Sequence, residues 1–265
     1  MPNLTKSEWQ AMCPDLTIEG TERNRCAALS EDMLRQASDD IRARGYLQLP
    51  QVIPSNLIAP LRTGMARLKD QNIPPVYIYL FDEAWHLFED LRPLISQILG
   101  EGYKTLPNFW AWHLSETGHA GWPPHKDCSA DTVFDVGGDQ IFMSLSLWVP
   151  LADVDAENGC MFVIPREQET NVAAGVELDR DLLSPYAQAL PATAGSVLGW
   201  PQDLIHWGGE YLNAEKPPRM SLSFEFQSNA FDPLAVPLLD TASPPSFEER
   251  LELLDQQFDK YRHIA

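Results

Sequence analysis

The chain has 265 residues, of which 44% are hydrophobic and 10% aromatic. This length fits one large domain or two small ones, and the composition supplies a substantial core, which argues against intrinsic disorder. Acidic residues outnumber basic ones 38 to 19, giving a formal net charge of −19. Such a surface repels phosphates, so we expect neither a nucleic acid nor an anionic membrane as a partner.

The four cysteines are far apart and form no CxxC pair: Cys13, Cys26, Cys128 and Cys160. This pattern favours reduced thiols over a zinc knuckle or a disulfide scaffold. The N-terminus lacks a basic segment followed by an apolar run, and no apolar stretch reaches the roughly 18 residues of a membrane-spanning helix. We therefore expect a soluble, cytoplasmic protein.

Residues 1–28 are largely polar and predict an irregular leader, whereas residues 29–102 predict a mainly helical layer. Ser30 is a suitable N-cap, and apolar residues recur at helical spacing up to Gly45. A short strand in YLQLPQVI and a second helix from about Ser55 to Lys69 follow. The stretch EAWHLFEDLRPLISQILG predicts a third amphipathic helix.

After residue 103 the sequence consists of short aromatic or β-branched stretches separated by Gly, Pro, Asn and Asp: LPNFWAWHLS, QIFMSLSLWVPL, CMFVIP, GSVLGW and RMSLSFEFQ. This pattern of short strands and turns predicts a β-sandwich or barrel over 103–230, with the preceding helices packed against it. Residues 231–265 are expected to form an extension that ends in a helix. We therefore expect a single domain over 1–265, of class α+β and mainly β.

A candidate metal site begins in GWPPHKDCSAD, where His125 and Asp127 are two positions apart. The two preceding prolines disfavour a helix, and in extended backbone such side chains point the same way. His206, in GSVLGWPQDLIHWGG, follows a glycine-containing strand and lies in an aromatic, glycine-rich turn, where it offers a third ligand. Two imidazoles and one carboxylate that leave one side of the metal open form the facial triad of non-haem Fe(II) oxygenases.

A candidate carboxylate-binding pair follows on the next strand, RMSLSFEFQ. Arg219 and Ser221 share one face of this strand because side chains alternate along it. A guanidinium with a neighbouring hydroxyl suits the far carboxylate of a dicarboxylic acid. Most arginines form surface ion pairs instead, but beside the triad the carboxylate-binding interpretation is favoured.

The HxD pair, the distal histidine and the arginine together resemble the Fe(II)/2-oxoglutarate dioxygenases. The stretch SLWVPLADVDAENGCMFVIP is similar to the xWxxLxDxxxENGxLxxIP-like segment of the phytanoyl-CoA dioxygenase branch. DDIRARGYLQLPQVIPSNLIAPLRTGMARL resembles the opening helix, strand and helix of that branch, so the resemblance covers roughly residues 30–230. One departure is that the family usually continues IPGSH, whereas Arg166-Glu167-Gln168 follow here.

The resemblance implies a double-stranded β-helix, a jelly-roll and cupin-like core with the N-terminal helices packed on one sheet. It implies Fe(II) bound by His125, Asp127 and His206, with 2-oxoglutarate and O2 as co-substrates. It also places Trp148 and Ser146 near the oxoglutarate.

Strand alternation directs Asn108, Trp110 and Trp112 to one side of their strand. We expect Asn108 and Trp112 to contribute to the same cofactor pocket. For Trp110 and Trp112, packing in a tryptophan-rich core is an equally good interpretation.

The implied activity is hydroxylation, desaturation or cyclisation of a small molecule, with release of succinate and CO2. Asp127 favours this over halogenation, because halogenating relatives lack the carboxylate so that chloride can bind. The acidic stretch 128–140 predicts a mobile loop over the site and weakly favours a polar or cationic substrate.

Two alternatives belong to other classes. One is a non-redox, metal-binding cupin-like barrel that binds or isomerises its ligand, since zinc accepts the same three ligands. It does not explain the pair formed by Arg219 and Ser221. The other is a degenerate family member kept as an interaction protein, which predicts a broken triad. The sequence leaves the substrate and the oligomeric state open.

Overall fold

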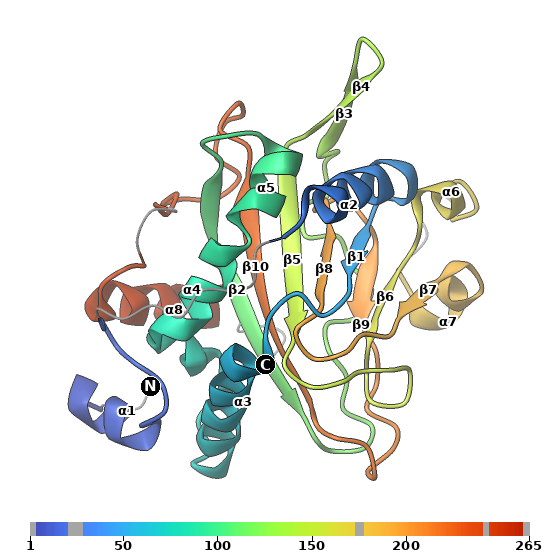
Figure 1. Cartoon of the computed structure of the whole chain (residues 1–265). Coiled ribbons are helices and arrows are strands. Elements are labelled where there is room, and N and C mark those ends of the chain that lie inside the picture. The colour runs from blue at the N-terminus through green and yellow to red at the C-terminus, as the bar shows by residue number, and fades with distance from the viewer. Residues whose placement is uncertain (1–3, 21–28, 173–177, 241–243, 262–265) are drawn as a thin grey trace.

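Two antiparallel sheets form the centre of the computed structural model, which describes residues 4–20, 29–172, 178–240 and 244–261 (Figure 1). The larger sheet has the strand order β1 (Leu47–Leu49), β8 (Val197–Trp200), β5 (Ser144–Pro150), β10 (Arg219–Gln227) and β2 (Lys104–Leu114). The smaller sheet has the order β7 (Gln188–Leu190), β6 (Met161–Val163) and β9 (His206–Gly208).

The inner faces of the two sheets pack against each other. Trp148 and Trp200 of the larger sheet share a buried cluster with Met161 and Leu190 of the smaller one. Side chains alternate across each strand, so the opposite face of the larger sheet remains to be covered by other elements. This two-sheet arrangement is the expected double-stranded β-helix.

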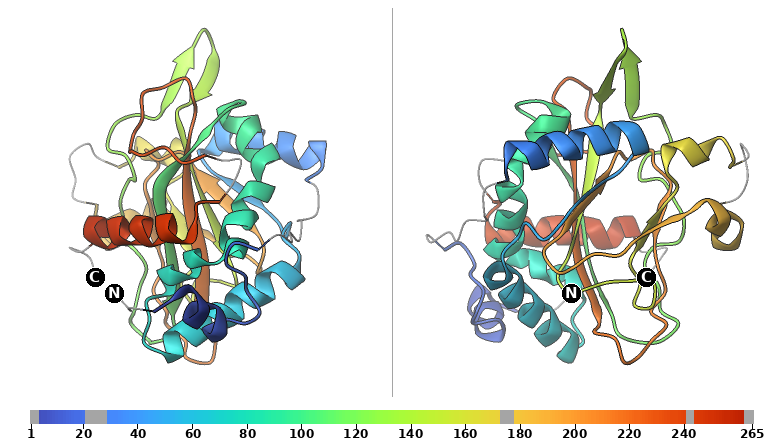
Figure 2. Two further views of the ribbon diagram at one scale, coloured as in Figure 1. Left: turned by 90° about the vertical axis from the view of Figure 1, so that its left-hand side faces the viewer. Right: turned by 45° about the vertical axis from the view of Figure 1, so that its right-hand side comes forward.

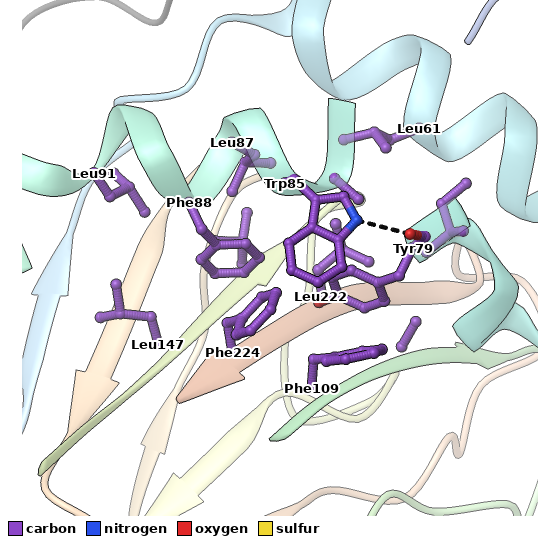
Figure 3. Packing of buried hydrophobic residues seen from close by; sticks show 14 of the residues in the cluster. Leu61, Tyr79, Trp85, Leu87, Phe88, Leu91, Phe109, Leu147, Leu222 and Phe224 are labelled. Carbon is purple, nitrogen blue, oxygen red and sulfur yellow. Dashed lines mark hydrogen bonds between the residues drawn. The ribbon is translucent and has the colours of Figure 1, made fainter. Parts of the chain in front are cut away.

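Helices cover the outer face of the larger sheet, as the sequence predicted (Figure 2). They are α2 (Glu31–Arg44), α3 (Ser55–Asp70), the 3₁₀ helix η1 (Pro75–Leu80), α4 (Asp82–Asp90) and α5 (Arg92–Leu99). Figure 3 shows Trp85 and Phe88 of α4 against Leu147 and Phe224 of the sheet. Each such side chain contributes roughly 1.5–3 kcal/mol by leaving water, which makes this layer the main core.

The first helical prediction is confirmed at both ends. The Ser30 side chain accepts a hydrogen bond from the Met33 amide, and Gly45 ends α2 with a φ of 84°. The third predicted helix is wrong in one respect, because the structure breaks it into α4 and α5 at Leu91. Pro93 explains the break, since its ring has no N–H to continue the helical hydrogen bonds.

The prediction of an irregular leader is also wrong for α1 (Lys6–Met12). Thr5 and Glu8 form a capping box at its start, a signal already present in the sequence TKSE. Trp9 is fully buried and stacks on Tyr77, with ring centroids 5.2 Å apart. The leader therefore includes a helix that packs on the main core.

Residues 128–140 do not form the expected loop over the site. Their second half belongs to a hairpin of β3 (Val133–Val136) and β4 (Asp139–Phe142), turned at Gly137 and Gly138, whose φ angles are 67° and 91°. The hairpin projects beyond the end of the larger sheet (Figure 1). Both glycines permit the left-handed turn that a tight hairpin requires.

The C-terminal helix α8 (Phe247–Tyr261) confirms the last predicted element and packs against η1 and β2 (Figure 2). A buried ion pair fixes its first half, with Arg250 Nη2 2.7 Å from Asp82 Oδ1. Gln257 fixes its second half by donating to Pro107 O and accepting from Phe109 N. No helix among the described residues is long and apolar enough to cross a membrane.

Replacing Arg250 with methionine should lower the free energy of unfolding by roughly 3–5 kcal/mol, because Asp82 would keep a buried charge without its partner. Urea unfolding followed by circular dichroism measures the change. Arg35→Met is the matched control, since the Arg35–Asp32 ion pair is exposed. Equal unfolding midpoints for the two variants would contradict this role of the Arg250–Asp82 pair.

Candidate metal centre and cavity

The structure brings the three predicted metal ligands together. His125 and His206 exchange two backbone hydrogen bonds of 3.0 Å each, so the turn that carries His125 lies directly beside β9. Asp127 Oδ1 lies 3.3 Å from His125 Nε2 and 3.6 Å from His206 Nε2. The three ligand atoms all lie within 4.8 Å of one another. His125 forms one isolated bridge and Asp127 lies in a bend, so neither belongs to a regular strand.

Both imidazole rings are oriented by carbonyl groups. His125 Nδ1 donates to Pro123 O at 2.7 Å, and His206 Nδ1 donates to Leu204 O at 3.0 Å. Because a carbonyl only accepts, the proton of each neutral ring lies on Nδ1, and the lone pair of Nε2 faces Asp127. The rings are therefore held in the tautomer that a metal ligand needs.

Electrostatics favour the metal-binding protonation states of His206 and Asp127, whereas the hydrogen bond and charge of Asp127 outweigh burial and raise the pKa of His125. Burial lowers the pKa of His206 to about 4, despite the opposing charge of Asp127, so this ring is neutral at physiological pH. Burial alone would raise the pKa of Asp127, but its interactions with His206 and His125 outweigh burial and hold the pKa well below its usual range. Ser146 also stabilises the carboxylate by donating to Asp127 Oδ2 at 2.7 Å.

Arg219 is a buried cation without an anionic partner among the described residues. Its side chain is 1% exposed, and its only hydrogen bond from Nη2 goes to Met161 Sδ at 3.5 Å. Burial lowers its pKa to about 10, so it remains charged at neutral pH. Since an unpaired buried charge is costly, this site fits an anionic ligand.

Other polar atoms in this region also lack a hydrogen-bond partner within the described ranges: Arg219 Nε and Nη1, Ser221 Oγ, Trp148 Nε1 and Trp200 Nε1. All but the Ser221 hydroxyl belong to residues that line the same cavity. Gly121 and Gly208 leave room for the guanidinium, because a Cβ on either would lie 2.6 Å from Arg219 Nη1. These donors fit the carboxylate oxygens of 2-oxoglutarate.

The metal ligands and Arg219 open into one cavity of about 260 Å³. Trp148, Trp112 and Ser146 all line it, and Ser146 also donates to Asp127. Their contact with oxoglutarate stays a prediction. Asn108 does not line this cavity, since its side chain lies behind Glu225 and donates to it. Nor does any residue of the β3–β4 hairpin belong to the lining.

Several lining residues were absent from the sequence-based prediction: Trp122, Trp200, Glu225, Lys260 and Tyr261. Strand alternation could have identified Glu225, which shares a face of β10 with Arg219 and Ser221. Lys260 and Tyr261 come from α8, and nothing in the local sequence indicates where that helix docks.

Glu225 is a half-buried carboxyl group that lines the same cavity as the candidate metal ligands. Burial, and then the charge of Asp127, raise its pKa to about 8. Gln202 and Asn108 donate to its Oε2 at 2.6 and 2.7 Å. A cation close to either carboxylate would favour the ionised form of Glu225.

Comparison with known proteins now identifies the family. Residues 86–221 match the family model described as Phytanoyl-CoA dioxygenase (PhyH). The match spans just over half of the chain, and the chain belongs to this family. It is an iron- and 2-oxoglutarate-dependent oxygenase, which confirms the main interpretation of the sequence. The extent of the domain over residues 1–265 stays a prediction.

Solved structures share the fold at low sequence identity. HygX from Streptomyces hygroscopicus, with nickel and 2-oxoglutarate bound, is 16% identical, with a TM-score of 0.57 over 77% of this chain and 89% of its own. The epimerase SnoN from nogalamycin biosynthesis is 17% identical, with a TM-score of 0.57 over 82% and 93%. The carbocyclase SnoK from the same biosynthesis is 15% identical, with a TM-score of 0.54 over 76% and 84%. Curated proteins gave no significant match.

Replacing Ser146 with alanine should weaken divalent-metal binding about 10- to 100-fold, because Asp127 loses the hydroxyl that orients its carboxylate. Titration of the metal-free protein with nickel(II), followed by calorimetry, measures the affinity. Ser196→Ala is the control, since that buried serine bonds Thr193 away from the metal ligands. Unchanged nickel affinity in Ser146→Ala would exclude the positioning role.

Proposed function

We propose that His125, Asp127 and His206 bind the Fe(II) ion and that the enzyme hydroxylates a small molecule. The observation that carries this proposal is the position of the unpaired Arg219 in the same cavity as the three converging ligand atoms. Iron, oxoglutarate and O2 together supply an oxidant able to attack an unactivated C–H bond, with release of succinate and CO2. A zinc-binding barrel without redox chemistry would not require the buried guanidinium.

The chain's own residues bind and orient the co-substrate. Arg219 provides the charge-assisted partner for the 5-carboxylate of oxoglutarate, and Ser221 lies two positions along the same strand face. Trp148 lies beside this guanidinium, with Arg219 Cζ 5.4 Å from a ring centroid. The buried surroundings exclude water, which strengthens these charged contacts relative to the same contacts in solution.

Asp127 determines the class of reaction in this proposal. A carboxylate in the triad occupies the position at which a halogenating relative would bind chloride. Oxygen insertion, or a related desaturation or cyclisation, is therefore favoured over halogen transfer. SnoN and SnoK, which share the fold, are described as an epimerase and a carbocyclase, so the family fold supports outcomes besides hydroxylation.

His125→Ala and His206→Ala should each abolish oxoglutarate turnover, because removing one imidazole leaves two protein ligands for the metal. Succinate release in the presence of Fe(II), oxoglutarate and O2 measures this. With a true substrate, the product should gain one oxygen atom or lose two hydrogens, as mass spectrometry would detect. A chlorinated product, or iron binding without oxoglutarate consumption, would contradict the proposal. The latter would favour the non-redox barrel.

Arg219→Ala should raise the KM for oxoglutarate about tenfold or more, since a hydrogen bond to a charged group contributes roughly 1.5–3 kcal/mol. Succinate formation at varied oxoglutarate concentration gives this value. The exposed Arg62 supplies the control variant Arg62→Ala, which removes the same charge far from the ligands. An unchanged KM in Arg219→Ala would assign the carboxylate contact to another basic residue.

A further inference from the structure

An aromatic wall forms one side of the cavity and consists of Trp110, Trp112, Trp122 and Tyr261. Neighbouring ring centroids lie 5.6 Å apart for Trp110 and Trp122, 5.0 Å for Trp112 and Trp122, and 4.9 Å for Trp122 and Tyr261. These rings come from β2, from the turn before His125 and from α8. Of these four, only Trp112 is among the residues predicted for the cofactor pocket, and none is a candidate metal ligand.

Glu225 lies between this wall and the metal ligands. On one side its strand partner is Ser146 of β5, which donates to Asp127. Two positions earlier on the same face of β10, Ser223 pairs with Trp110 of the wall. A group bound at Glu225 would therefore lie beside the metal centre and against the indole rings.

One oxygen of Glu225 remains available to a ligand. The two hydrogen bonds from Gln202 and Asn108 both go to Oε2, and no described residue donates to Oε1. Lys260 makes no hydrogen bond to this carboxylate, because its Nζ donates to Asn108 Oδ1 at 2.7 Å, although its charge acts to lower the pKa of Glu225. Within the described part of the chain, Glu225 has no cation within 4.0 Å to form an ion pair.

We propose that Glu225 and the aromatic wall bind an ammonium group, and that the substrate of this enzyme is a small organic amine. The proposal rests on the proposed function, since it concerns the same cavity. A carboxylate oxygen accepts a charge-assisted hydrogen bond from N–H, and the faces of indole rings attract a cation. Lys126 and Lys260 also line the cavity, so an acidic substrate is the competing class.

The test compares three ligands of similar length: pentylamine, which is cationic at pH 7, 1-pentanol, which is neutral, and pentanoate, which is anionic. Each is titrated into the protein loaded with nickel(II) and oxoglutarate, which occupy the metal site without turnover. Quenching of tryptophan fluorescence reports binding beside the wall. Pentylamine should bind at least about tenfold more tightly than the other two.

Glu225→Gln keeps the size of the side chain and removes its charge. This variant should lose the preference for pentylamine over 1-pentanol. Glu215→Gln, at an exposed carboxylate, is the matched control and should keep the preference. Trp122→Leu provides a second variant that leaves Glu225 in place, and it should weaken pentylamine binding about threefold or more by removing one ring.

Equal binding of pentylamine and 1-pentanol to the unmodified protein, or tighter binding of pentanoate, would overturn the proposal. An undiminished preference for pentylamine in Glu225→Gln would overturn it as well. These results differ from a failure of the proposed function, which would appear as absent succinate formation with iron, oxoglutarate and O2. A Glu225-dependent preference for pentylamine without that activity would support the amine site and reject the oxygenase assignment.

Discussion

The reciprocal backbone hydrogen bonds between His125 and His206 are the contact on which the proposed metal centre depends. They fasten an irregular, proline-containing turn to β9, and so bring together ligands that are about 80 positions apart in the chain. Each histidine then donates its Nδ1 proton to a carbonyl two residues earlier, so the same local backbone fixes both ring orientation and tautomer. The ligand geometry is thereby set by the main chain, which leaves the cavity side chains free to serve the co-substrate and the substrate.

Charge organises the remainder of the cavity. Arg219 is buried without an anion among the described residues, whereas the half-buried Glu225 has no direct cationic partner there. Charged groups without a partner lower the stability of a folded protein, and ligands of opposite charge restore that stability. Binding of oxoglutarate and of a cationic substrate would consequently stabilise the native state as well as prepare it for reaction.

The candidate metal-binding and carboxylate-binding residues could be predicted from the sequence, whereas several other residues that line the cavity could not. His125 and Asp127 follow from spacing and from the prolines that exclude a helix, and Arg219 and Ser221 follow from strand alternation. Trp122 and Tyr261 could not be inferred, because they reach the cavity through the docking of a turn and of a distant helix. The division of the third helix at Pro93 and the capping box at Thr5 were readable in local sequence and were missed.

The docking of α8 has a consequence for how this protein could diversify. The helix is attached by Arg250 in its first half and by Gln257 in its second half, and its last two residues, Lys260 and Tyr261, line the cavity. None of the metal ligands, and neither Arg219 nor Ser221, belongs to it. Substitutions in the last turn of α8 can thus change which substrate binds without changing the residues proposed for oxidation. Substrate selectivity and reactivity can therefore evolve in separate segments of the chain.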